Sequence, residues 1–485
     1  MKHLGSQATK HILLFEPLQG NSSIIRLLNQ ETGHISTVRI GIDDHDFRHR
    51  IHQEFPSVIA DVIDLAVAIH AADQLTIQDP MQPQIQVKVV LPIRHPELLN
   101  QSSLQQHLTQ LLDWVTGKKW TFEFVKRSQP GRSIENQRLL GSSDPDVDEV
   151  ALWSGGLDAL AGLYTRQKQS PRKAFALLGS GSNDQNYARQ QQVFHGLQDL
   201  LPNRRLDLCR VPLRFDESRK APKNRLSRAR GIVFILLGSA CAYLRGLKVL
   251  HVYENGIGAI NLPYRKSAVG LDHSRSVHPE TLLRVGRLMS DLIGDNFKVR
   301  NPFLFNTKAE MLMLLSEDGQ SELVSLTSSC DRPHRKPQQP AQCGYCSSCI
   351  LRKQALAASQ LEDKSYYIVP HGRSPAKDFR LYMYSMLDQV STLRERLTMS
   401  SEAAEQWKAL SRRFPELDDV VDRTHTEEEI TASEMRRRLI RLFHVYITEW
   451  NVVENALEAQ FEQKTTPKLV AHESEPPIQQ RLLCR

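Results

Sequence analysis

The sequence predicts an α/β protein whose central part is a parallel sheet covered by helices. Strand and helix patterns alternate from about residue 148 to 310, as they do in chains that build parallel sheets. A glycine-rich turn joins the first of these strands to its helix, and four of the seven cysteines fall within one short window. The 485 residues, 40% of them hydrophobic, are enough for about two to four domains with buried cores.

The charge balance is mildly basic, because 62 Lys and Arg stand against 55 Asp and Glu. A net charge of +7 suits an anionic substrate such as ATP, or contact with nucleic acid. The apolar run at residues 12–15 is too short for a signal peptide, and no apolar stretch approaches the roughly 20 residues that cross a bilayer. We therefore expect a cytoplasmic protein without a membrane partner.

The first 130 residues predict an α+β accessory domain, followed by a linker rich in loop formers at 131–147. Helical periodicity and strand alternation mark its elements. Strands are expected at 11–15, 37–42, 85–89 and 120–125, and helices at 55–75 and 104–115.

The domain at 148–358 contains the alternating patterns, and ligands of such sheets bind beyond the carboxyl ends of the strands. Residues 359–485 predict a helical C-terminal region, with helical patterns at 393–414 and 427–463 and a frayed, proline-containing tail. In the central domain, strands are expected at 149–153, 174–178, 206–211 and 248–253, and helices at 158–169, 186–200 and 230–244.

The glycine-rich turn has the composition of an anion site. Two glycines let the backbone turn sharply and approach a ligand, and the first amides of the following helix have no partner within the helix. The serine can add a hydroxyl donor, and the aspartate can reach a phosphate through Mg²⁺. An ordinary strand-to-helix junction is the alternative. The residues predicted to bind ATP are Ser154, Gly155, Gly156, Leu157 and Asp158.

The cysteine cluster combines Cys330 with Cys343, Cys346 and Cys349. Four thiolates suit tetrahedral Zn²⁺, and Gly344 permits the tight turn between two of them. No histidine lies between the last three cysteines, so the pattern predicts a closed, structural zinc site. A redox pair, an iron–sulfur cluster or four unrelated buried thiols are the alternatives.

The turn at 154–158 resembles the PP-loop of the ATP-pyrophosphatase superfamily, although Ala159 stands where that superfamily usually has serine. Together with the later cysteine cluster and Arg352, it resembles QueC, the 7-cyano-7-deazaguanine synthase family. The resemblance covers about residues 148–358. It implies a parallel-sheet fold of the adenine nucleotide alpha hydrolase type, with ATP, Mg²⁺ and Zn²⁺ bound.

The resemblance also implies a reaction. Members of that family adenylate 7-carboxy-7-deazaguanine, ammonia attacks to give an amide, and a second ATP-dependent step dehydrates the amide to the nitrile. Arginines at a helix start and a lysine in a turn can contact phosphate, and polar residues beyond a strand end can contact substrate. The catalytic residues expected are Asp158, Arg228, Arg230 and Lys308. The substrate-binding residues expected are Glu254, Asn255, Gly256, Asn261 and His278.

The chain departs from typical QueC enzymes in its length and in the loops at 179–182 and 254–280. This layout is similar to the QueC-like proteins of bacterial anti-phage defence cassettes, such as QatC and those of CBASS cassettes. The similarity implies that a deazaguanine carboxylate is still activated, that ammonia or a protein N-terminus attacks it, and that a protein from the same cassette is a partner. Direct nucleic-acid binding is not required. The flanking regions are expected to recruit the partner.

Two other functions remain open from the sequence. A tRNA-modifying PP-loop enzyme that performs thiolation would use a cysteine as sulfur carrier and would bind RNA through a basic surface. A non-catalytic scaffold of a defence complex would bind nucleotide through a degenerate loop, as the alanine at 159 and the altered loops allow.

Overall fold

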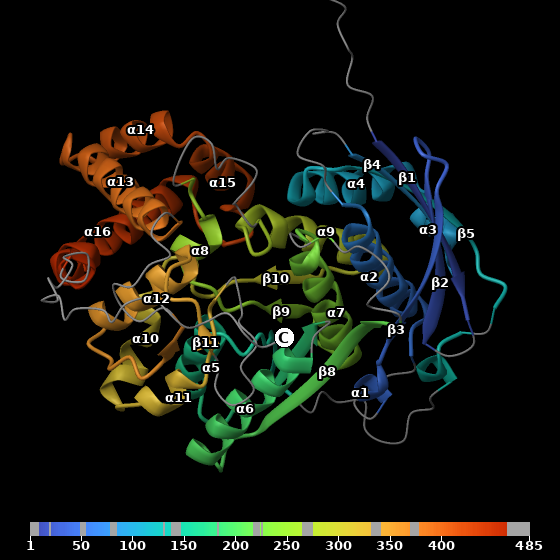
Figure 1. Ribbon diagram of the computed structural model, residues 1–485, viewed down its shortest axis with the longest axis horizontal. Helices are drawn as coiled ribbons and strands as arrows, with labels where there is room; N and C mark the ends of the chain where they lie inside the picture. Colours follow the sequence, from blue (N-terminus) through green and yellow to red (C-terminus); the bar gives the residue numbers. More distant parts are fainter. Residues whose placement is uncertain are drawn as a thin grey trace, which may run out of the picture.

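One mixed sheet runs through the computed structural model, and helices pack against it (Figure 1). The structure describes residues 9–18, 21–48, 55–77, 85–129, 131–136, 147–181, 184–216, 224, 227–263, 275–330, 341–368 and 378–462. In this part of the chain ten strands form the sheet, in the order β10 (Lys298–Arg300), β9 (Val249–His251), β6 (Glu149–Leu152), β7 (Phe175–Gly181), β8 (Leu206–Phe215), β3 (Ile35–Ile42), β2 (Ser22–Asn29), β1 (Thr9–Pro17), β4 (Ile85–Ile93) and β5 (Lys119–Lys126).

The central half of the sheet, from β10 to β8, is parallel throughout, as the sequence predicts. Strands β6 and β7 are almost completely buried, because helices cover both of their faces. One face packs against α7 and α9, and the other against α5 and α6, with α10 and α12 beyond them. These helices are α5 (Leu157–Gln169), α6 (Asp184–Leu200), α7 (Arg230–Leu244), α9 (Pro279–Ile293), α10 (Lys308–Glu317) and α12 (Ser347–Ala358).

The N-terminal half of the sheet is mixed. Strands β1, β4 and β5 are parallel to one another, whereas β2 is antiparallel to both β1 and β3. Alternating burial along β4 shows that one face is in the core while the other faces solvent. The predicted strands and helices are present, and β2 is an additional strand. The helical elements here are α1 (His45–Arg48), α2 (Ser57–Leu75), α3 (Pro96–Leu99), α4 (Ser102–Thr116) and η1 (Ser133–Asn136).

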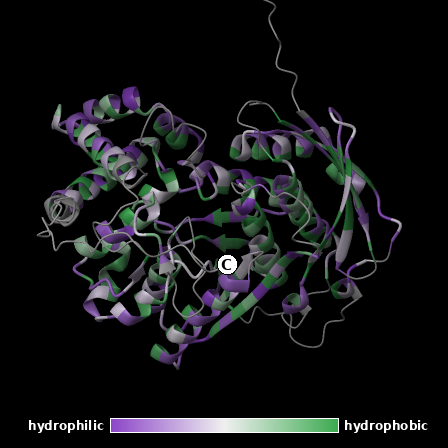
Figure 2. Ribbon diagram, in the orientation of Figure 1, coloured by the Kyte–Doolittle hydropathy of each residue, from purple (hydrophilic) through white to green (hydrophobic). Residues whose placement is uncertain are grey.

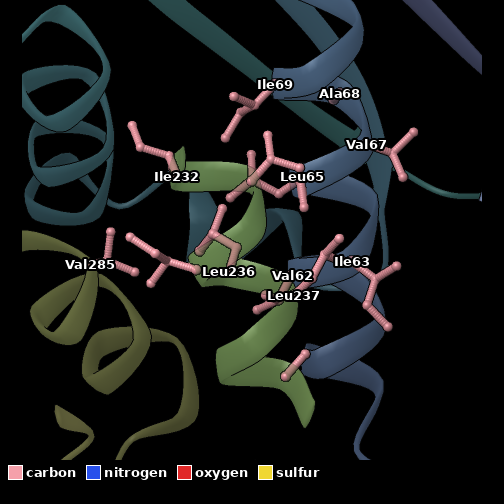
Figure 3. Close-up of a cluster of buried hydrophobic side chains, with 14 of the residues drawn as sticks. Val62, Ile63, Leu65, Val67, Ala68, Ile69, Ile232, Leu236, Leu237 and Val285 are labelled. Carbon is pink, nitrogen blue, oxygen red and sulfur yellow. The ribbon is translucent and has the colours of Figure 1, made fainter. Parts of the chain in front are cut away.

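Strand β8 joins the two halves of the sheet. Its first seven residues pair with β7, and its last three pair antiparallel with β3. The helices on one side of this sheet share a core. Leu65 and Ile69 of α2 pack against Ile232 and Leu236 of α7 (Figure 3). Val285 of α9 lies beside them. The boundaries expected between the first two domains stay predictions, but the regions on either side share one sheet and one core.

The C-terminal region is helical, as the sequence predicts. The pattern at 393–414 is divided between two helices, because Ser400 accepts a hydrogen bond from the Glu402 amide and so interrupts the helical ladder. Figure 2 shows hydrophobic residues along the inner strands and both hydrophobic and hydrophilic residues along these helices. Among the described residues, no helix is long and apolar enough to cross a membrane. The remaining elements are α8 (Gly256–Ile260), α11 (Ser321–Ser325), β11 (Ala341–Gln342), β12 (Tyr366–Tyr367), α13 (Asp378–Thr398), α14 (Ala403–Arg413), α15 (Glu416–Thr424) and α16 (Ala432–Glu462).

Candidate functional site

The turn between β6 and α5 lies at the carboxyl end of the central strands. Gly155 has a φ of +70°, in the left-handed region that favours glycine, and Gly156 is the N-cap of α5. A Cβ on Gly155 would stand 3.1 Å from the Cα of Gln190. The Ser154 hydroxyl accepts a hydrogen bond from the Gly156 amide at 3.1 Å. The turn is therefore built for close backbone approach, and the free amides of α5 begin directly after it.

Four of the residues predicted for the site meet just beyond this turn. Asp158 lies in the first turn of α5, and its Oδ2 is 2.8 Å from the Nζ of Lys308. The Asn255 amide donates to Oδ1 of Asp158 at 2.9 Å and to Oε1 of Glu254 at 2.7 Å. The structure thus brings together residues from three places in the chain: the segment after β6, the segment after β9 and the start of α10. Both Asn255 and Lys308 are buried.

The electrostatics of this cluster set unusual protonation states. Burial and the nearby Asp158 carboxylate raise the pKa of Glu254 to about 8. Burial acts to lower the pKa of Lys308, but Asp158 and Glu254 outweigh it and the pKa is raised. At neutral pH the cluster therefore holds a protonated Glu254 beside a charged lysine. Such a set can contact phosphate, ligate a divalent cation through Asp158 and exchange a proton at Glu254.

Local backbone structure fixes the residues around this cluster. Asn255 caps α8, since its Oδ1 accepts from the Gly258 amide at 2.8 Å. Asn301, just after β10, donates to the carbonyl of Glu254 at 2.8 Å. Gly256 packs against the carbonyl of Leu304 so closely that a Cβ would collide with it. Asn261 ends α8 in a left-handed conformation. Asn301 is not among the residues predicted for the site, although a polar residue directly after a strand was an available signal.

Three further predicted residues have contacts elsewhere. His278 is buried, caps α9 by accepting from the Glu280 amide at 3.3 Å, and stands edge-on to Trp114. Burial, followed by Arg275, lowers the pKa of His278 to about 4. Arg228 lies beside Gly117, at the turn that follows α4, and Arg230 is the exposed first residue of α7. None of these particular contacts, all in the described part of the chain, reaches Asp158.

The four clustered cysteines come together as a metal site would require. Their Sγ atoms all lie within 4.8 Å of one another, and no disulfide joins the cysteines that the structure describes. Cys346 is the N-cap of α12, and Cys349 lies in the first turn of that helix. Backbone amides donate to the Sγ atoms of Cys330 and Cys343, as expected for thiolates. The donor set fits tetrahedral Zn²⁺, which these four residues would hold.

The cysteine cluster is connected to the glycine-rich turn through residues 327–329. Arg352, fully buried, donates to the hydroxyl of Thr327 at 2.8 Å and to the hydroxyl of Ser365 at the same distance. Next along the chain, the carbonyl of Ser328 lies 3.5 Å from where a Cβ on Gly156 would be. Ser328 was not predicted, because nothing in a serine two residues before a cysteine indicates a contact with a distant turn.

Fold and site together define an α/β protein with a glycine-rich strand-to-helix turn and a four-cysteine cluster. Residues 277–360 match the family model for queuosine biosynthesis protein QueC. The chain is also similar to 7-cyano-7-deazaguanine synthases of Coxiella burnetii strains Dugway 5J108-111 and RSA 493, at 33% identity over 75 residues. That similarity covers 16% of this chain and 31% of each relative, so the chain spans about a third of the curated relatives it matches.

Proposed function

We propose that this protein uses ATP to adenylate the carboxylate of a 7-deazaguanine, which an amine then attacks. One observation carries the proposal: Lys308, inside the segment that matches QueC, contacts Asp158, in a turn outside that segment. The matched segment also contains all four cysteines. The glycine-rich turn and the cysteine-containing segment therefore lie together, although the family match includes only the cysteine-containing segment.

The residues present are suited to such a reaction. The amides of the turn and of α5 would bind the phosphates, and Asp158 would hold Mg²⁺. Lys308 would then face phosphate in place of its present partner. The substrate carboxylate would attack the α-phosphorus with loss of pyrophosphate, and the amine would attack the carbonyl carbon with loss of AMP. In its ionised form, Glu254 would accept the proton that the amine releases.

Two further features of the reaction are proposed, the attacking amine and the biological setting. The amine is ammonia, giving an amide or nitrile, or the N-terminus of a partner protein, giving a conjugate. The setting is a bacterial anti-phage cassette that supplies the partner. The substantial N- and C-terminal regions outside the matched segment, and the loops at 179–182 and 254–280, support a changed acceptor.

Sulfur transfer, as in tRNA thiolation, fits the cysteines less well. A sulfur carrier must be reached by its substrate. Cys343 and Cys349 are 0% exposed and Cys346 is 3% exposed, so a structural metal site accounts better for these three, while Cys330 is half-buried.

The test is incubation of the protein with ATP, Mg²⁺ and 7-carboxy-7-deazaguanine, with and without ammonia. AMP and pyrophosphate should form, and Asp158→Ala should abolish them. Gly155→Ala should also block ATP binding, because its Cβ would meet the Gln190 backbone. Gly294→Ala is the matched control, since Gly294 has a φ of +68° and no atom within 4 Å. Absence of both products with every amine tried would refute the proposal. A biological activity unchanged in Asp158→Ala would favour the scaffold function instead.

A further inference from the structure

The C-terminal helix α16 carries none of the site motifs, yet it contacts the start of α10. Arg441 and Glu449, about two helical turns apart on α16, both reach residues at that helix terminus. Lys308, which pairs with Asp158, is the first residue of α10. Helix α16 begins well beyond residue 360, where the match to QueC ends.

Glu449 binds the cap of α10 directly. Its carboxylate accepts a hydrogen bond from the hydroxyl of Thr307 and a second, at 3.2 Å, from the side chain of Gln354. Thr307 and Gln354 are both 0% exposed. Gln354 lies on α12, the helix that begins at the cysteine cluster. One carboxylate therefore links the residue next to Lys308 with the helix that carries Cys349.

Arg441 binds the other half of the same cap. In the capping box of α10, the Thr307 amide donates to Glu310 at 2.9 Å and the Glu310 amide donates to Thr307 at 3.1 Å. The Arg441 guanidinium forms an ion pair with Glu310 and donates to the Phe305 carbonyl at 3.1 Å. The next residue of α16, Leu442, lies against Gly256, just after Glu254 and Asn255.

We infer that Glu449 and Arg441 are positioning residues that hold the first turn of α10, so that Lys308 faces the glycine-rich turn. The direction of a lysine side chain in the first turn of a helix is set by that turn. A small rotation of the first turn of α10 would therefore carry the Nζ of Lys308 away from Asp158. The C-terminal region then completes the site, in addition to any recruitment of a partner. This inference rests on the proposed function only for the identity of the ligand.

The experiment compares Glu449→Ala and Arg441→Ala with the control Thr448→Ala. Thr448 is exposed, and its hydroxyl donates to the His444 carbonyl of its own helix. In the full-length protein, hydrogen exchange of the amides at 308–312 and the Kd for ATP are measured. Both alanine variants should speed the exchange and weaken ATP binding about tenfold, or roughly 1.4 kcal/mol, while the control matches the wild type. Glu449→Gln keeps an acceptor for Thr307 and should recover most of the binding.

The outcomes separate the two proposals. If the wild type binds no ATP, the proposed function fails, but the exchange at 308–312 still tests the positioning role. If that exchange in Glu449→Ala and Arg441→Ala is the same as in the Thr448→Ala control, the positioning role is wrong. Should Glu449→Ala not fold, Arg441→Ala decides, because Arg441 is 52% exposed and its loss leaves no cavity.

Discussion

Glu254 is a residue of the candidate site whose protonation changes in the neutral range. Its pKa is raised from 4.5 to about 8 by burial and then by Asp158, against the opposing effect of Lys308. The folded protein thus keeps a proton that the unfolded chain releases above about pH 4.5. The stability that this proton contributes is complete below that pH and is lost as pH rises through about 8.

We predict that Glu254→Gln removes this pH dependence. The amide keeps an oxygen for the Asn255 donor and does not titrate, so between pH 5 and 9 the wild type should lose on the order of a few kcal/mol more than the variant. Thermal unfolding across that range measures it. Glu362→Gln is the control, because Glu362 is 72% exposed. If the stability of the wild type and of Glu254→Gln changed with pH in parallel, Glu254 would be ionised in the folded protein.

The structure brings Asp158 and Asn255, which follow strands, together with Lys308, which begins a helix, but it places the other predicted helix-start residues elsewhere. Asp158 and Asn255 lie in the segments after β6 and β9, where the topology of a parallel sheet brings ligand-facing residues together. His278 also precedes a helix, but its imidazole caps α9. Proline directly after it was a helix-start signal that favours this capping role. Whether such a residue faces a ligand or its own helix depends on packing that the sequence pattern does not contain.

Among the helices and strands, several long periodic segments were predicted from the sequence, whereas other elements, including α9, α10 and α12, were not. Strand β2 has no strict alternation of buried and exposed residues, since most of its residues are half-buried. Helix α15 was also missed, because it is short and lies among charged residues. The Cys330–Cys349 cluster was predictable because metal-ligand spacing is local in sequence.

We predict one zinc ion per chain, held by that cluster. Cys343→Ser should lose the metal and several kcal/mol of stability, because the thiolates supply folding free energy through the ion. The segment at 327–329 should then exchange its amides faster, since its neighbour Cys330 would no longer be held. Elemental analysis and hydrogen exchange measure these effects.

Cys241→Ser provides the control for the cysteine cluster. Cys241 is buried in α7, away from the four clustered residues, and its loss should leave the zinc content unchanged. Iron with visible absorption in the wild type would contradict zinc and indicate an iron–sulfur cluster.

At the scale of the whole molecule, the regions that the sequence divides pack together around the central sheet and α9. The N-terminal region contacts α9 through a 2.7 Å hydrogen bond between His107 and Asp291. The C-terminal region contacts it through Arg423, which pairs with Glu280 at 2.6 Å. The β3–β8 pairing involves only three residue pairs, far apart in sequence, and no local pattern marks it. This is why the continuity of the sheet was not predictable, although both of its halves were.

The shared core predicts that the N-terminal and central regions unfold as one unit. Leu65 of α2 is 0% exposed and meets Ile232 and Leu236 of α7 (Figure 3). Leu65→Ala should cost about 2–5 kcal/mol, through lost contacts and the cavity left behind. Native-state hydrogen exchange should show the amides of β4 and β6 losing protection by the same free energy.

Leu14→Ala is the matched control for this loss. Leu14 is 40% exposed, on the solvent face of the N-terminal half of the sheet, so its replacement should change stability by under about 1 kcal/mol. If Leu65→Ala weakened protection in β4 while β6 kept its own, the two regions would be separate folding units. If β6 loses protection equally, the turn at 154–158 depends on α2 for its stability, because that turn begins where β6 ends.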